Sequence, residues 1–190
     1  RPPARQFRPD SPGPMSARAA LLLIALHLSA LPFPAQADGG APRLRTDTPS
    51  GQPVPRFVSL KHEETNCRLG PSSGHPIRYV FRRKGAPMLV IAESVDHWRK
   101  LRDAAGDECW AHRVTLRAQT HVQATNETVL RKKPAADAEA SATLGPGVLA
   151  RIDARKDAWL KVSAGGAQGW VAASAVFGGE ALAAFGEPRD

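Results

Sequence analysis

The sequence predicts an all-β protein built from two tandem small β-barrels, and three observations lead to this fold class. A pattern around one pair of tryptophans is written twice, short apolar segments alternate with turn residues, and no long amphipathic segment interrupts them. Short strands at such close spacing are typical of small antiparallel barrels rather than of α/β domains.

The internal repeat is the most direct of these observations. Two segments of the first copy, Asp96–Leu101 and Glu108–Ala111, correspond to Asp157–Val162 and Gln168–Val171. The offset falls from 63 residues between Arg68 and Arg131 to 60 residues at the last tryptophan of each copy. Such a drift is expected when two copies of one domain shorten their loops and keep their strands. A period near 60 is too long for a solenoid unit.

Each copy is expected to contain five short strands. In the first copy these are Phe57–Leu60, Ile77–Phe81, Met88–Ile91, Trp98–Arg102 and Trp110–His112, and in the second Val122–Ala124, Val129–Arg131, Val148–Ile152, Trp159–Val162 and Trp170–Val171. Turn residues such as Gly70–Gly74 and Gly145–Gly147 separate them. The alanine-rich stretch Ala135–Ala142 could form a helical turn.

The N-terminal region has the features of an export signal. A basic start follows Met15, an apolar run covers Ala19–Leu31, and Ala35-Gln36-Ala37 forms a small-x-small cleavage site. Residues 1–14 are interpreted as a non-native segment translated upstream of the true start, and residues 15–37 as a Sec-type signal peptide cut after Ala37. An uncleaved membrane anchor is the alternative, but the run is shorter than the roughly 20 residues that a span needs. The protein is therefore expected in the periplasm or secreted, which is an oxidising compartment.

The mature chain is expected to be divided into four parts. Residues 38–55, rich in Gly and Pro, predict a flexible linker. Two barrel domains follow at residues 56–117 and 118–178, and residues 179–190 predict a flexible tail.

The positive charge is concentrated in the first domain. The formal net charge is +8, and it falls to about +5 without residues 1–37, which hold four arginines and one aspartate. Residues 55–117 contain twelve Lys and Arg against seven Asp and Glu, whereas residues 118–190 contain eight of each. The run Arg82-Arg83-Lys84 could meet an acidic polymer or a membrane surface, although such runs are more often solvated hairpin faces. Export argues against nucleic acid as a partner.

Two cysteines, Cys67 and Cys109, lie in the first domain at positions that the second copy fills with Leu130 and Gly169. A pair gained together in one copy of an exported repeat predicts a disulfide. Two free buried thiols remain the alternative. A zinc site is disfavoured because neither cysteine belongs to a metal-ligand spacing.

No catalytic, cofactor or metal site is expected. The sequence has no glycine-rich phosphate loop, no H-E-x-x-H and no G-x-S-x-G motif. Cys109 and His112 are three residues apart along a strand, so their side chains would diverge rather than act as nucleophile and base.

The tryptophans are the better candidates for a binding site. Along a strand Trp98 and Leu101 lie on opposite faces, so an indole should point outward where its aliphatic neighbour faces the core. Such indoles suit a peptide or a sugar ring. The candidate ligand-binding residues are Trp98, Trp110, Lys100, Arg102, Tyr79, Trp159 and Trp170. Alternatively, the rings cover the end of a barrel or pack one domain on the other.

At these residues the sequence resembles bacterial SH3-like domains of exported proteins. Asn66–Pro71 is similar to the family's N-V-R-x-G-P strand and loop, and the D-x-W and closing G-W-V patterns occur at Asp96–Trp98 and, as Glu108–Ala111, at the end of the first copy. The second copy, about Thr120–Phe177, has Lys132-Lys133-Pro134 where x-G-P is expected. The resemblance implies a small five- to six-stranded β-barrel with a binding role, often at peptidoglycan or cell-envelope proteins.

Two functional hypotheses follow. The first is a non-catalytic exported module that attaches to peptidoglycan peptide or glycan, and the second is a periplasmic adaptor that recruits an envelope enzyme or sensor. Recognition of proline-rich helices is not expected, because Tyr79 is the only tyrosine. Neither hypothesis requires a cofactor, nucleic acid or a membrane span after cleavage.

If the signal peptide is removed as expected, mass spectrometry of the exported protein will show an N-terminus at Asp38. Removal of residues 15–37 follows from the small residues at the cleavage site. An exported protein that retains Ala19–Leu31 would contradict the expectation and favour the membrane anchor.

Overall fold

The computed structural model describes residue 45 and residues 47–180. These residues form two antiparallel β-sheets, so the all-β class is confirmed. The expected upstream segment, the signal peptide and most of the expected tail lie outside the described residues. Within the described residues, no helix is long and apolar enough to cross a membrane.

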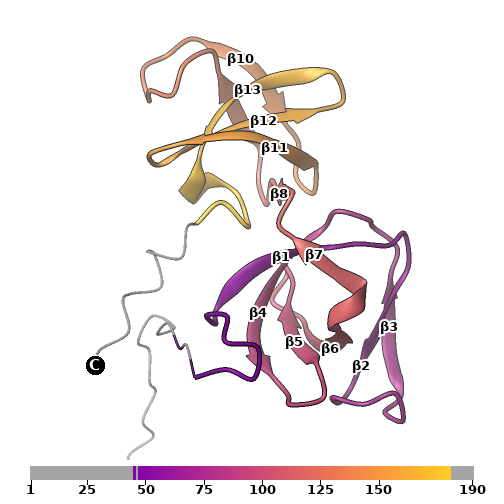
Figure 1. Ribbon diagram of the computed structural model, residues 1–190. Coiled ribbons are helices and arrows are strands. Elements are labelled where there is room, and N and C mark those ends of the chain that lie inside the picture. The colour runs from indigo at the N-terminus through magenta and orange to yellow at the C-terminus, as the bar shows by residue number, and fades with distance from the viewer. Residues whose placement is uncertain (1–44, 46, 181–190) are drawn as a thin grey trace, which may run out of the picture. The chain divides into compact units, whose positions relative to one another are not determined.

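The first sheet has seven strands in the order β3-β2-β6-β5-β4-β1-β7 (Figure 1). Their bounds are β1 Arg56–Leu60, β2 Thr65–Arg68, β3 Ile77–Phe81, β4 Pro87–Glu93, β5 Trp98–Arg102, β6 Glu108–His112 and β7 Leu116–Ala118. A single 3₁₀ turn, η1 (Arg113–Thr115), connects β6 to β7.

The second sheet has six strands in the order β10-β9-β13-β12-β11-β8. Their bounds are β8 His121–Gln123, β9 Thr128–Arg131, β10 Ala140–Leu144, β11 Leu149–Lys156, β12 Trp159–Ala164 and β13 Ala167–Ala172, followed by the 3₁₀ turn η2 (Ala173–Ala175). This order repeats that of the first sheet, in which β1 to β6 occupy the places of β8 to β13. The repeat read from the sequence is therefore a repeat of topology.

Three strands are not among those expected from the local residue pattern, although the family resemblance implies a strand at β2. β2, β7 and β10 are short or rich in polar residues and alanine, so their own residues carry little strand signal. Of the helical turn suggested for Ala135–Ala142, the structure has only one hydrogen-bonded turn, from Ala135 to Ala138, and Ala140–Leu144 pairs with β9. Pairing within the sheet outweighs the weak helical preference of a short alanine-rich stretch.

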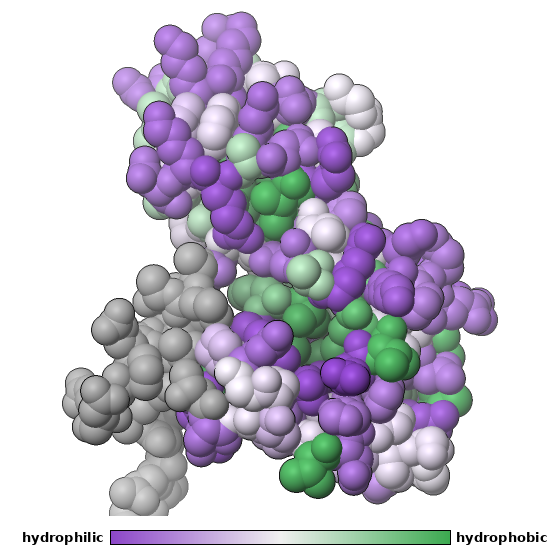
Figure 2. Space-filling model, in the orientation of Figure 1, coloured by the Kyte–Doolittle hydropathy of each residue, from purple (hydrophilic) through white to green (hydrophobic). Residues whose placement is uncertain are grey.

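Each sheet curves around its own apolar core. Leu60, Met88 and Leu101 are fully buried in the first core, and Leu130, Leu160 and Val162 in the second. The pairing register shifts between Val90 and Ala92 in β4, and between Ile152 and Ala154 at the same place in β11. Such bulges bend a strand and increase its twist, which lets a few strands wrap around a small core. The outer surfaces are mostly hydrophilic with small apolar patches (Figure 2).

The segment before β1, expected to be part of a flexible linker, makes specific contacts in its described residues. Arg45 and Val54 form an antiparallel bridge. Ser50 donates two hydrogen bonds to Glu93 of β4, from its backbone N–H at 3.1 Å and from its hydroxyl at 2.9 Å. Val54 is buried in the first core. We refer to residues 47–55 as the N-terminal arm.

Cys67 and Cys109 form a disulfide, as predicted, with their Cα atoms 5.4 Å apart. It joins β2 to β6 and points into the first core, where both residues are buried. In the second domain, the corresponding two strands also come close together, and the position of Cys109 is occupied by Gly169. A Cβ on Gly169 would lie 2.8 Å from the Cβ of Leu130, so the leucine fills the space that the disulfide occupies in the first domain.

Replacing Cys67 and Cys109 together by serine should lower the free energy of unfolding by about 4 kcal/mol, because the crosslink closes a long loop in the unfolded chain. Urea titration of both proteins measures the difference, and the native protein should offer no thiol to an alkylating reagent. A loss below about 1 kcal/mol would show that the crosslink constrains the unfolded chain far less than this chain-entropy estimate.

Candidate functional site

The outward face of β5 and β6 collects most of the predicted site residues of the first domain. Antiparallel pairing places Trp98 opposite His112, Lys100 opposite Trp110, and Arg102 opposite Glu108. Residues that are directly opposite point to the same side of a sheet. We call this surface the aromatic face, formed by Trp98, Lys100, Arg102, Glu108, Trp110 and His112.

The predicted alternation of inward and outward side chains is confirmed along these two strands. Leu101 and Ala111 are fully buried, whereas Trp98 and Trp110 are only half-buried. The rings of Trp98 and His112 meet edge to face, with centroids 5.4 Å apart. The face therefore presents partly exposed indoles that a flat or apolar group can cover.

Glu108, which the sequence argument did not single out, changes the charge of the aromatic face. One of its carboxylate oxygens lies 2.5 Å from Lys100 Nζ, and the other lies 2.6 Å from an Arg102 nitrogen. Hydrogen bonds from Lys100 and Arg102, together with their charges, hold the pKa of Glu108 below its usual value. The aromatic face thus carries one net positive charge. The sequence does indicate that Glu108 belongs to this face, because Glu108 lies two residues before Trp110 on the same strand.

Tyr79 does not belong to the aromatic face. It lies opposite Cys67, whose side chain is buried, and therefore points toward the core. Its ring packs edge to face on Phe81 with centroids 5.0 Å apart. Burial, reinforced by the charges of Asp103 and Asp107, raises the pKa of Tyr79.

The second domain has the two indoles without the same charges. Trp159 lies opposite Ala172, and Trp170 lies opposite Lys161. The positions of Arg102 and Glu108 are taken by Ser163 and Gln168, which lie opposite each other. The structure thus groups the predicted residues as one pair of tryptophans on each sheet, with the acid–base cluster in the first domain.

An arginine next to each second tryptophan holds a loop in place. Arg68 lies opposite Trp110, and Arg131 lies opposite Trp170. Each arginine donates to a backbone carbonyl seven residues further on, at 2.7 Å in both domains. The loop at Lys132-Lys133-Pro134 is therefore anchored like the first one, although its sequence departs from x-G-P.

The basic run Arg82-Arg83-Lys84 is partly neutralised at the surface. Arg82 pairs with Glu64 at 3.2 Å and Lys84 with Glu63 at 3.6 Å, and all four side chains are exposed. This arrangement agrees with a solvated hairpin face, the alternative to binding of an acidic polymer or a membrane surface. Exposed pairs of this kind contribute little stability.

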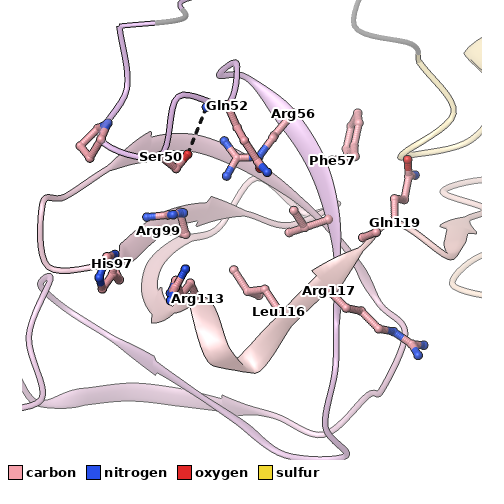
Figure 3. A pocket seen from close by; sticks show the side chains of 13 residues that line it. Ser50, Gln52, Arg56, Phe57, His97, Arg99, Arg113, Leu116, Arg117 and Gln119 are labelled. Carbon is pink, nitrogen blue, oxygen red and sulfur yellow. Dashed lines mark hydrogen bonds between the residues drawn. The ribbon is translucent and has the colours of Figure 1, made fainter.

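A pocket of about 610 Å³ lies in the first domain beside the N-terminal arm. Four arginines and a histidine line it, as Figure 3 shows: Arg56 of β1, Arg99 of β5, Arg113 of η1, Arg117 of β7, and His97 of the β4–β5 turn. We call this cavity the arginine pocket. This pocket could not be predicted from the sequence, because its residues are far apart in the chain and Arg99 occupies a strand position that faces inward.

The carboxylate of Glu93 forms ion pairs with two of these arginines. Its side chain is fully buried, and one carboxylate oxygen lies 2.5 Å from Arg56 and 2.9 Å from Arg99. Burial alone would raise the pKa of Glu93, but hydrogen bonds from Ser50 and Arg56 and the charges of both arginines bring the pKa below its usual value. Glu93 is therefore an anion held in the interior by its cations.

The described residues contain no group of three or more His, Cys, Asp and Glu side chains that could hold a metal ion. Both surfaces offer hydrogen bonding, ion pairing and aromatic contact. These are the interactions of a binding site.

Comparison with known proteins gives a family relationship. A profile of the bacterial SH3 domain matches the chain twice, over residues 61–117 and 124–178. No curated protein matches it. Similar solved structures include NlpC1 and NlpC2 from Trichomonas vaginalis, with 16% and 14% identity over 65% of this chain and a TM-score of 0.29 in both cases. The chain covers 45% and 48% of these two proteins, less than half of either.

Replacing Glu93 by glutamine should destabilise the first domain by about 3 kcal/mol at pH 7, because it leaves buried Arg99 without its counter-charge. Since the folded-state pKa of Glu93 is lowered, the carboxylate contributes stability above its unfolded-state pKa of about 4.3 and loses that contribution as the pH falls through the lower folded value. The difference between wild type and E93Q should therefore shrink below about pH 4.

Urea unfolding at several pH values measures this difference. Glu64→Gln, at an exposed carboxylate, is the matched control and should change stability little. A difference between wild type and E93Q that stays constant from pH 7 to pH 3 would contradict the assignment of Glu93 as a buried anion.

Proposed function

Because the chain belongs to the bacterial SH3 domain family, we propose that it is an exported binding protein whose first domain attaches to cell-wall peptidoglycan through the aromatic face. Tandem domains of this family support a binding role. The disulfide fits an oxidising compartment outside the cytoplasm. The expected export signal, on residues outside the described part of the chain, agrees with this location.

The observation that carries the proposal is the combination of Trp98 and Trp110 with neighbouring charges on one outward face. Peptidoglycan presents saccharide rings, which stack on indoles, and peptide stems, which carry carboxylates. An aromatic surface with one net positive charge complements both. The internal pairing of Lys100 and Arg102 with Glu108 keeps the cationic groups in fixed positions.

A second candidate function, recruitment of an envelope protein, is favoured by the edge of the first sheet at β3, which pairs only with β2 among the described residues. β3 is the last strand in the order, and Ile77 and Val80 on it are exposed together with Leu69 of the preceding loop. An exposed strand edge with apolar side chains can pair with an extended segment of another protein.

Trp98→Ala should weaken binding to purified peptidoglycan sacculi by roughly 1 to 3 kcal/mol while the domain stays folded, as expected for an anchor residue outside the core. A pull-down at ~0.3 M salt measures binding, since non-specific attraction between charges is screened at that ionic strength. Trp159→Ala is the matched control, and it should reduce binding less, because the second domain has Ser163 and Gln168 in place of Arg102 and Glu108.

Absence of sacculus binding by the wild type would reject the peptidoglycan proposal and favour the adaptor. Unfolding of the first domain by Trp98→Ala would show that the indole supports the core rather than the ligand.

A further inference from the structure

The arginine pocket occupies positions that the second domain fills with uncharged side chains. Arg99 lies opposite Ala111, and the residue in the same register of the second sheet is Leu160, which is buried opposite Val171. Arg113 and Ala173 begin the corresponding 3₁₀ turns. His97 and Ala158 precede the first tryptophan of their copies.

The second domain shows that the fold can form without the charged residues of the arginine pocket. A leucine is sufficient at the position of Arg99, and a well-packed apolar residue there avoids the cost of removing charges from water. The buried pairing of Arg56 and Arg99 with Glu93 is therefore not a requirement of the fold. Such a departure from simple packing is expected where a site is held in position.

The charges of the pocket are not balanced within it. Glu93 is the carboxylate that pairs with Arg56 and Arg99, while Arg113 is exposed and its side chain makes no hydrogen bond or ion pair with the described residues. Burial and the charges of Arg56 and Arg113 lower the pKa of Arg99. The Nε atom of Arg56 is buried and has no hydrogen-bond partner in the described part of the chain.

Two histidines connect the pocket to the aromatic face. The backbone N–H of Arg113 donates to the carbonyl of His97 at 3.0 Å, so both pocket residues are fixed to each other. The His97 ring lies 6.4 Å from that of His112, which in turn lies 5.4 Å from the ring of Trp98. A continuous row of rings therefore runs from the pocket to the indole.

We propose that the arginine pocket binds the carboxylate of a peptide whose chain extends across His97 and His112 toward Trp98. Guanidinium groups bind carboxylates with paired hydrogen bonds, and Arg113 is free to supply them. The pocket has the volume of a small-ligand site, and the N-terminal arm forms one wall through Pro49, Ser50 and Gln52. This inference rests on the proposed function, since peptide stems of the wall carry such carboxylates.

The test is an NMR titration of the isotope-labelled protein with N-acetyl-Ala-Ala and with the same dipeptide amidated at its C-terminus. The acid should shift the backbone signals of His97, Trp98 and Arg113, and the amide should not. Arg113→Gln should reduce affinity for the acid at least tenfold, whereas Arg113→Lys, which keeps the charge but loses the paired donors, should fall between the two. Arg82→Gln, the same change at an exposed arginine outside the pocket, should have no effect.

Equal binding of acid and amide, or an unchanged affinity in Arg113→Gln, would overturn the proposal. Inorganic phosphate serves as a further probe, and phosphate binding without any peptide binding would show a general anion site instead. Failure of sacculus binding with intact, carboxylate-dependent dipeptide binding would reject the wall function alone. Intact sacculus binding that is insensitive to Arg113→Gln, together with no dipeptide response, would reject the pocket alone.

Discussion

Each domain depends on one junction between strands, β2 with β6 in the first and β9 with β13 in the second, because it attaches a two-stranded hairpin to the other strands of the sheet. In the first domain, the inward side of this junction is closed by the Cys67–Cys109 disulfide. On the outward side Arg68 lies opposite Trp110 and holds the following loop. A single strand pair therefore positions the core, a loop and an indole of the aromatic face.

The second domain reaches the same junction by different chemistry. Leu130 packs over Gly169, where any larger residue would collide with it, and Arg131 holds its loop as Arg68 does. A covalent crosslink and a leucine–glycine contact are thus two solutions to one close approach between strands. The loops and tryptophans can be retained while the interior changes, because the outward and inward faces of a strand are independent in side-chain composition.

The first domain differs from the second in having charged side chains buried in its interior. The carboxylate of Glu93 forms ion pairs with Arg56 and Arg99, and it also accepts a hydrogen bond from Ser50 of the N-terminal arm. The arm is thereby tied to the domain through a buried carboxylate, and the same interaction forms the base of the arginine pocket. Since the aromatic face adjoins this pocket through His97 and His112, the first domain has both an aromatic and a cationic surface for a ligand.

The all-β class, the duplication, the disulfide and the outward orientation of the tryptophans could be predicted from the residues alone. Each of these follows from local periodicity or from a comparison of one copy with the other. Three features depend on contacts between distant strands: Glu108 pairs with Lys100 and Arg102, Tyr79 faces the core, and β10 is a strand. The arginine pocket also required it, because Arg56, Arg99 and Arg113 come from separate elements and an inward-facing arginine has no sequence pattern of its own. Long-range pairing brings these charges together, and the period of a strand shows only to which side each residue points.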